Sequence, residues 1–273
     1  MIVLERNIVC DDEQADLKLY LWENSEEYKN NETKPMMIIC PGGGYSKLSD
    51  REGQAVALQY CAMGYHAAVL KYSLAPVHYP VQLHQLAAAV ALCRENAEKW
   101  YIDPDRISVT GFSAGGNLVG MFGTCWHKPE LASAIGKTPE LIRPDALILC
   151  YAVLLAGERT HLGSWRNLLG ENYESRWQEL SPVNCVSEQT PPCFLWHTGE
   201  DATVPVDSSI EFACALHKHF VPFDLHIYQT GPHGMALCNQ LTDSAKKPRV
   251  NEAAAQWITQ AHLWLKQLWN LPY

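Results

Sequence analysis

The expected fold is decided by the stretch Ile107-Ser108-Val109-Thr110-Gly111-Phe112-Ser113-Ala114-Gly115-Gly116-Asn117-Leu118. Its β-branched start predicts a buried strand, and the apolar residues that continue beyond it predict a helix. Gly111, Ser113 and Gly115 form a Gly-x-Ser-x-Gly pattern between the two. Between a strand and a helix, this pattern is typical of a sharp turn that exposes the serine hydroxyl. We interpret Ser113 as a candidate nucleophile, with a plain glycine-rich turn as the alternative.

The turn predicts a strained backbone at Ser113 and requires small residues on either side of it. Side chains at Gly111 and Gly115 would collide with the adjoining strand and helix. The helix that begins after the serine would direct its N–H groups and the positive end of its dipole toward the hydroxyl.

Length and composition predict one large α/β domain and exclude some classes of partner. The chain has 273 residues, of which 47% are hydrophobic, and a net charge of −9. This length and hydrophobic content suit a single core. Nucleic acids and anionic membranes bind basic surfaces, so we expect neither as a partner of this acidic chain.

The N-terminus and the cysteines indicate a cytoplasmic protein. Residues 1–6 lack the basic region and apolar core of a signal peptide, and no uncharged apolar run reaches membrane-spanning length. Ten cysteines are spread along the chain, mostly in apolar segments such as those around Cys40, Cys93, Cys150 and Cys214. We expect buried free thiols rather than disulfides. No Cys-x-x-Cys pair is present, so we expect no metal site.

Hydrophobic patterns along the chain predict eight strands and five main helices. The strands are expected at residues 2–10, 16–22, 36–40, 66–72, 107–110, 145–153, 192–197 and 223–228. The helices are expected at 50–63, 80–100, 114–126, 206–220 and 251–269. This alternation predicts a mostly parallel sheet with helices on both faces and an antiparallel hairpin at its N-terminal edge. Residues 154–188 show no strand pattern, and we expect a small lid-like insertion within a single domain, 1–273.

Two loops supply candidate partners for Ser113. In parallel sheets, sites gather at the carboxyl ends of the strands. Asp201 follows the strand 192–197, and His233 follows the strand 223–228. A serine nucleophile needs a base, and the base needs a third group that orients it. His233 is the candidate base and Asp201 the candidate acid, with the adjacent Glu200 as the alternative acid.

Taken together, these motifs resemble the α/β-hydrolase superfamily, and within it the esterase/lipase group that includes hormone-sensitive-lipase-like and acetyl-esterase-like enzymes. The residues that carry the resemblance are 41–45, 72–76, 103–107, 111–115, 199–205 and 231–234. It covers the chain from about residue 36 to the end. It implies an α/β-hydrolase fold and a triad of Ser113, His233 and Asp201. The family's Gly-x-x-Asp-x-x-Val-Pro pattern, aligned on Val204-Pro205, selects Asp201 over Glu200, although the chain is one residue shorter before the acid.

The resemblance also implies an oxyanion hole. The family's His-Gly-Gly-Gly pattern aligns with residues 41–44, so Gly43 and Gly44 would donate their backbone N–H groups together with Ala114. Pro41 replaces the family's histidine, and any support which that histidine gives to the loop is absent here.

These features predict a serine esterase that works through an acyl-enzyme and needs no cofactor. The small lid indicates a short acyl group, and the resemblance to acetyl-esterase-like enzymes implies acetyl esters of sugars or xylo-oligosaccharides as small-molecule substrates. Tyr45, Trp165 and Trp196 are candidate flat surfaces for a sugar, with core or lid packing as the alternative.

Two other functions remain open from the sequence. One is an amide hydrolase, either an arylformamidase or a small peptidase. The other is a non-catalytic ligand-binding protein on a hydrolase scaffold. A homodimer that pairs through the apolar edge hairpin is a further hypothesis.

Overall fold

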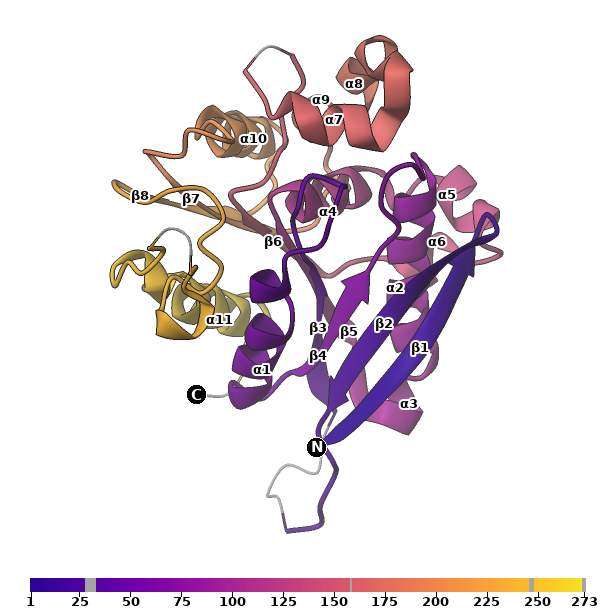
Figure 1. Cartoon of the computed structure of the whole chain (residues 1–273). Helices are drawn as coiled ribbons and strands as arrows, with labels where there is room; N and C mark the ends of the chain where they lie inside the picture. The colour runs from indigo at the N-terminus through magenta and orange to yellow at the C-terminus, as the bar shows by residue number, and fades with distance from the viewer. Residues whose placement is uncertain (28–32, 158, 246–247, 272–273) are drawn as a thin grey trace.

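The computed structural model of the chain describes residues 1–27, 33–157, 159–245 and 248–271. Within these residues, eight strands form one sheet in the order β1-β2-β4-β3-β5-β6-β7-β8 (Figure 1). The strands are β1 (Ile2–Cys10), β2 (Glu13–Leu21), β3 (Lys34–Cys40), β4 (His66–Lys71), β5 (Ile102–Phe112), β6 (Ala146–Cys150), β7 (Cys193–Thr198) and β8 (Phe223–Tyr228). The predicted eight-stranded sheet is confirmed.

The sheet is mostly parallel, with an antiparallel N-terminal edge. β1 pairs with β2 and β2 pairs with β4 in antiparallel register, and every other neighbouring pair is parallel. The central strand β3 is buried along nearly its whole length, as expected for a parallel strand that is covered on both faces. The parallel strands β3 to β8 therefore end at one edge of the sheet, and the loops that follow them meet there.

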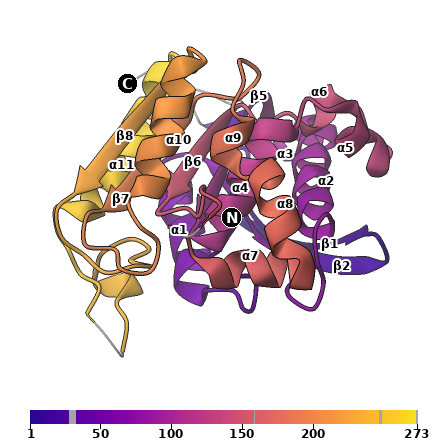
Figure 2. The same ribbon diagram turned by 90° about the horizontal axis from the view of Figure 1, so that it is seen from above.

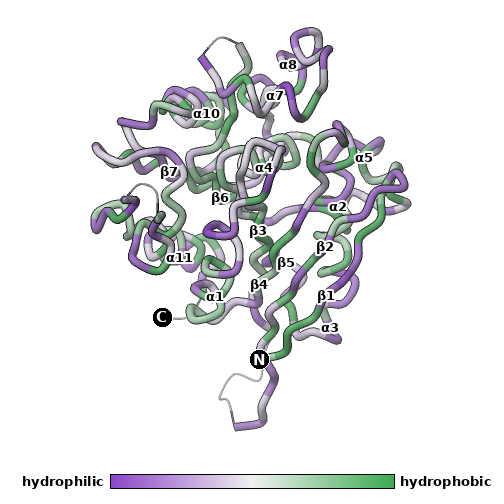
Figure 3. The backbone as a smooth tube through the Cα atoms, in the orientation of Figure 1, coloured by the Kyte–Doolittle hydropathy of each residue, from purple (hydrophilic) through white to green (hydrophobic). Residues whose placement is uncertain are grey.

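Helices cover both faces of the sheet. α1 (Gln54–Ala62) and α11 (Trp257–Leu268) pack on one face, whereas α2 (Val81–Glu95), α4 (Ala114–Cys125) and α10 (Asp207–Lys218) pack on the other. The alternation of β3 shows the two layers, because Ile38 joins one core and Met37 and Ile39 join the other. Hydrophobic residues accordingly follow the central strands (Figure 3).

The segment between β6 and β7 contains short helices. These are α7 (Leu162–Leu169), a 3-10 turn (Gly170–Asn172), α8 (Tyr173–Leu180) and α9 (Pro182–Cys185). The described part of this segment contains no strand, as predicted. α9 packs against α4. In the view from above, α7, α8 and α9 lie on the viewer's side of α4 (Figure 2). That the segment acts as a lid stays a prediction.

Several element boundaries differ from the prediction. The helix expected at 80–100 ends at Glu95 and resumes as α3 (Ala97–Trp100), because Asn96 turns its side chain back to the carbonyl of Leu92. Two short helices, α5 (Pro129–Ala134) and α6 (Pro139–Ile142), lie where none was predicted. The helices that were expected to begin at 50 and 251 start with 3-10 turns, at Asp50–Glu52 and Ala254–Gln256.

The cysteines are all free thiols, and seven of the ten are buried. The prediction of a buried thiol is wrong for Cys214, which lies on the exposed side of α10. Among the described residues, no helix combines the length and the hydrophobicity that a membrane span requires.

Candidate active site

Ser113 lies at the junction of β5 and α4 in a strained conformation. Its backbone angles are φ 53° and ψ −116°, in a region that L-residues rarely adopt. A Cβ atom at Gly111 would lie 2.4 Å from the carbonyl oxygen of Gly115, and one at Gly115 would lie 2.1 Å from that of Cys40 on β3. Both contacts are impossible, so the predicted strain and the predicted need for glycine are confirmed.

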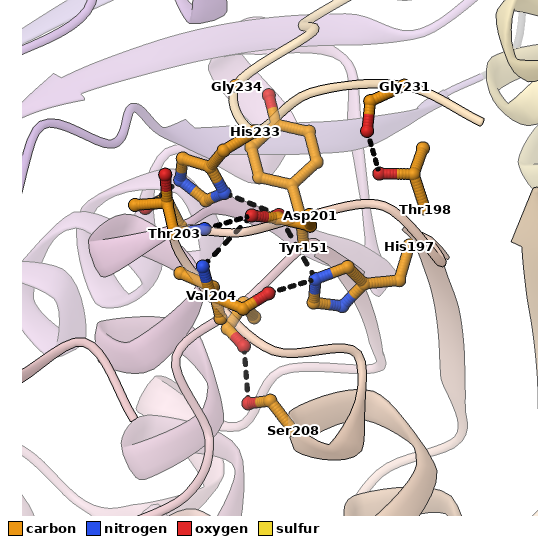
Figure 4. Close-up of polar contacts among 12 residues, drawn as sticks. Tyr151, His197, Thr198, Asp201, Thr203, Val204, Ser208, Gly231, His233 and Gly234 are labelled. Atoms are coloured by element: carbon orange, nitrogen blue, oxygen red, sulfur yellow. Dashed lines mark hydrogen bonds and ion pairs between the residues drawn. The ribbon is translucent and has the colours of Figure 1, made fainter. Parts of the chain in front are cut away.

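Three loops bring Ser113, His233 and Asp201 into one hydrogen-bonded chain. Ser113 Oγ lies 2.8 Å from His233 Nε2, and His233 Nδ1 lies 2.6 Å from Asp201 Oδ2. A carboxylate only accepts hydrogen bonds, so Nδ1 carries the proton and Nε2 is left to accept one from the serine hydroxyl. Figure 4 shows the imidazole of His233 next to the carboxylate. The geometry is that of a nucleophile, a base and an orienting acid.

The carboxylate of Asp201 is held by four hydrogen bonds. Oδ1 accepts from the backbone N–H groups of Thr203 and Val204, each at 2.9 Å, and Oδ2 accepts from His233 and, at 3.2 Å, from His197 (Figure 4). Burial by itself would raise the pKa of Asp201. The hydrogen bonds from the two histidines outweigh burial and hold this pKa well below its usual range. Asp201 is therefore ionised at neutral pH.

The glycine loop after β3 presents free N–H groups beside Ser113. No described residue accepts a hydrogen bond from the backbone N–H of Gly43, Gly44 or Ala114. Gly43 and Gly44 have positive φ angles of 129° and 66°, and both lie in the wall of the cavity that contains Ser113. The loop also has support in place of the missing histidine, because the hydroxyl of Tyr72 donates to the carbonyl of Pro41 at 2.6 Å.

A buried carboxylate, which the sequence reasoning missed, connects this loop to the loop of His233. Glu52 Oε2 accepts the N–H of Gly42 at 2.8 Å, and Oε1 accepts the hydroxyl of Tyr151 at 2.7 Å. The same hydroxyl accepts the N–H of Ala236, three residues after His233, at 2.9 Å. Burial and the charge of Glu52 raise the pKa of Tyr151 well above its usual range, so the hydroxyl keeps its proton. Glu52 thus fixes one loop directly and the other through Tyr151.

We expect Glu52→Gln to lower kcat for 4-nitrophenyl acetate by about ten- to a hundredfold, because small displacements of catalytic groups have effects of this size. Glutamine can accept only one of the two hydrogen bonds, so either Gly42 or Tyr151 loses its acceptor. Steady-state kinetics together with a thermal melt test this effect. The matched control is Glu98→Gln on α3, which replaces an exposed carboxylate far from the loops. Equal kcat values for the Glu52 variant, the control and the wild type would contradict a positioning role.

Ser113 opens into a cavity of about 840 Å³ whose described lining side chains are mostly polar or charged. Its wall includes Gly43, Gly44 and His233, and Leu48 is the only large apolar side chain among the described lining residues. The cavity is therefore suited to a polar ligand that reaches the serine hydroxyl.

His161, at the start of α7, lines the same cavity and was also missed from the sequence. Its Nδ1 accepts the backbone N–H of Ser164 at 3.2 Å, so a neutral ring must carry its proton on Nε2. Burial and then the nearby His233 lower the pKa of His161, which favours that neutral ring. His161 thus offers a hydrogen-bond donor to a ligand from the side of the short helices.

The three aromatic candidates for a sugar surface are wrong in this structure. Tyr45, Trp165 and Trp196 are each 0% exposed, and none of them lines the cavity. The hydroxyl of Tyr45 donates to Asn117, the indole of Trp165 donates to the carbonyl of Leu155, and Trp196 stacks on a core tryptophan of α11 at 5.3 Å. All three rings are packed inside the protein, which was the alternative interpretation.

Comparison with known proteins identifies a family and several relatives whose names state an activity. The profile of the BD-FAE family matches residues 19–216. Over 214 residues (74% of the chain), the sequence is 36% identical to endo-1,4-beta-xylanase B from Butyrivibrio fibrisolvens, and over 236 residues (84%), it is 29% identical to an acetylxylan esterase from Xylanibacter ruminicola. The chain covers 33% and 45% of these two relatives, so it spans less than half the length of either.

A solved structure matches the chain over nearly its whole length. It is the acetyl ester-xyloside bifunctional hydrolase from Caldicellulosiruptor lactoaceticus, with 35% sequence identity and a TM-score of 0.81. The match covers 94% of this chain and 89% of the other. The architecture of the described residues is therefore shared with a solved hydrolase.

Proposed function

Because the chain belongs to the BD-FAE family and has an α/β-hydrolase fold, we propose that it is a serine esterase that hydrolyses short-chain carboxylic esters through Ser113, His233 and Asp201. One observation carries the proposal, namely the unbroken hydrogen-bonded chain from Ser113 Oγ through His233 to Asp201. A serine in a strained turn that has no base beside it would not support such chemistry.

The reaction begins when Ser113 Oγ attacks the ester carbonyl and His233 Nε2 accepts its proton. Asp201 keeps the imidazole in the required tautomer and stabilises the imidazolium. The N–H groups of Gly43, Gly44 and Ala114 bind the oxyanion. His233 then returns the proton to the departing alcohol, and water, activated by His233, hydrolyses the acyl-enzyme.

The substrate class follows from the cavity and from the named relatives. The polar wall around Ser113 suits a hydroxyl-rich alcohol. One relative is an acetylxylan esterase, and the matching solved structure is an acetyl ester-xyloside hydrolase. The alcohol part of the substrate is then a sugar or a xylo-oligosaccharide, and the acyl part is acetyl.

We expect kcat/KM to fall about tenfold from 4-nitrophenyl acetate to the butyrate and further to the octanoate. Each added methylene must be accommodated in a cavity whose described wall has Leu48 as its only large apolar side chain. The three esters share one leaving group, and their alkaline hydrolysis rates serve as the chemical control. An octanoate that is hydrolysed as efficiently as the acetate would contradict a short acyl site.

A substrate panel tests the proposed activity against the two alternatives from the sequence. The panel contains 4-nitrophenyl acetate, acetylated xylo-oligosaccharides, N-formylarylamines and aminoacyl amides, each assayed for release of acid. Release of acetate from the first two supports the esterase. Faster turnover of the amides would make the protein an amide hydrolase, and turnover of no substrate would favour the ligand-binding protein.

A further inference from the structure

Two arginines converge beside His233 in the cavity of Ser113. Arg51 Nη1 donates to the carbonyl oxygen of Gly234 at 2.9 Å, and Arg249 Nη1 donates to the same oxygen at 3.0 Å. Arg51 also reaches the carbonyl of Thr242 at 3.2 Å. Both side chains are partly exposed and line the cavity wall. Two guanidinium groups on one carbonyl next to the catalytic base form a concentrated positive site.

Neither arginine has a carboxylate partner among the described residues. No Asp or Glu side chain of the described residues lies within 4 Å of either guanidinium group, and the two oxygens of the nearby Glu52 accept hydrogen bonds from Gly42 and Tyr151. Arg249 Nε is buried and finds no acceptor in the described part of the chain. Burial and then the charge of Arg51 lower the pKa of Arg249, and the charges of Glu52 and Asp201 offset this only in part. The two arginines are thus a like-charge contact that a bound anion would relieve.

The described wall of the cavity contains more cationic than anionic side chains. Among the described residues, its Lys, Arg, Asp and Glu side chains are Lys47, Asp50, Arg51, Glu52 and Arg249. Three of them are cationic and two are anionic, whereas the whole chain has a net charge of −9. A locally positive wall in an acidic protein attracts an anionic ligand group.

The location of the pair indicates which part of a substrate it faces. Both arginines bind Gly234, the residue after His233, and His233 delivers the proton to the departing alcohol in the proposed mechanism. The oxyanion donors Gly43 and Gly44 belong to a different loop. The pair therefore flanks the alcohol part of the ester.

We propose that Arg51 and Arg249 form an anion subsite that selects esters whose alcohol part carries a carboxylate, such as an acetylated sugar acid. This inference rests on the proposed esterase function and deepens it. A carboxylate accepts two N–H groups from one guanidinium, or one from each of two. Either arrangement employs N–H donors for which the described residues supply no acceptor.

The kinetic test compares two acetate esters of one shape. 4-Acetoxybenzoate carries a carboxylate in its alcohol part, and 4-acetoxybenzamide carries a neutral amide in the same place. Each kcat/KM is divided by the ester's alkaline hydrolysis rate, which removes the difference in leaving-group reactivity. We expect the wild type to favour the benzoate by about tenfold or more, and the preference to shrink as salt is added. A corrected ratio of one or less would overturn the proposal.

Variants separate binding of an anion from support of the loop. Arg249→Gln should lower the benzoate-to-benzamide ratio by about tenfold, chiefly through KM, and Arg249→Lys should retain part of the preference because it keeps the charge but not the planar fork. Arg6→Gln on the edge hairpin is the matched control, and its ratio should equal that of the wild type. If Arg249→Gln weakens both substrates equally, the arginine only holds Gly234 and the proposal is wrong.

A binding measurement keeps this inference separate from the proposed function. Calorimetric titration of the wild type with 4-hydroxybenzoate and 4-hydroxybenzamide requires no hydrolysis. Tighter binding of the benzoate, weakened by Arg249→Gln, supports the subsite even if no ester is turned over. Equal binding of the two compounds overturns the subsite even if the esterase activity is established.

Discussion

Replacing Ser113 with alanine is expected to lower kcat for 4-nitrophenyl acetate by about a millionfold, which corresponds to about 8 kcal/mol of transition-state stabilisation. The variant removes the hydroxyl that forms the acyl-enzyme in the proposed mechanism and leaves His233 without a proton donor at 2.8 Å. Free N–H groups at Gly43 and Ala114 would remain, so residual activity above that of water alone is expected.

The matched control for this variant lies on β5, the strand that leads to Ser113. Ser108 is fully buried in β5, and its hydroxyl has no hydrogen-bond partner in the described part of the chain. Ser108→Ala should therefore keep the wild-type kcat and lose no stability. Single-turnover kinetics and a thermal melt of both variants provide the comparison. Substantial activity in folded Ser113→Ala would remove Ser113 from the mechanism.

Replacing Asp201 with asparagine is expected to lower kcat by about ten-thousandfold. Thr203 and Val204 both donate to one oxygen, so the amide oxygen of asparagine must take that place. The amide NH₂ then faces His233 Nδ1, which can no longer donate and must accept. The proton of the imidazole moves to Nε2, where it blocks acceptance of the proton from Ser113.

Glu200→Gln is the matched control, since it makes the same chemical change at the neighbouring residue. Glu200 is exposed, and among the described residues its carboxylate accepts only a long hydrogen bond of 3.3 Å, from the N–H of Gly231. We expect kcat to stay near the wild-type value. A larger loss from Glu200→Gln than from Asp201→Asn would assign the acid to Glu200, the alternative that the sequence left open.

The sequence predicts the sheet and the convergence of its loops because both depend on local patterns. A β-branched strand that runs into Gly111, Ser113 and Gly115 allows few backbone geometries, and the clashes at the two glycines show why. Once a parallel sheet is expected, the loops after β7 and β8 must end near Ser113. The positions of Asp201 and His233 follow from that topology rather than from long-range information.

Residues that act through distant contacts are not predictable in this way. Glu52 accepts a hydrogen bond from Tyr151, which is 99 residues later in the sequence, and Arg51 donates one to Gly234, which is 183 residues later. Nothing in the polar segment around residue 50 indicates that its carboxylate is buried. His161 lies in the insertion between β6 and β7. Only its hydrogen bond from the N–H of Ser164 to Nδ1 shows that the neutral ring carries its proton on Nε2.

The aromatic residues show a different error, because the sequence analysis placed Tyr45, Trp165 and Trp196 at the site and the structure buries them in the core. A tryptophan near a loop can equally bind a sugar or fill the core, and the sequence does not distinguish the two. Trp196 lies within β7, and its direction is set by the pleat of the strand, which turns the ring toward α11. Whether Trp196 faces the core or the site depends on the register of the sheet, and the hydrophobic pattern alone does not determine that register.

The central claim is that Ser113 is a nucleophile activated by His233, and labelling with a fluorophosphonate tests it most directly. The wild-type chain is treated with the probe, digested, and analysed by mass spectrometry. The account predicts one adduct, on the peptide that contains Ser113, and much slower labelling when His233 is replaced by alanine. No adduct on Ser113, or equal labelling without His233, would contradict it.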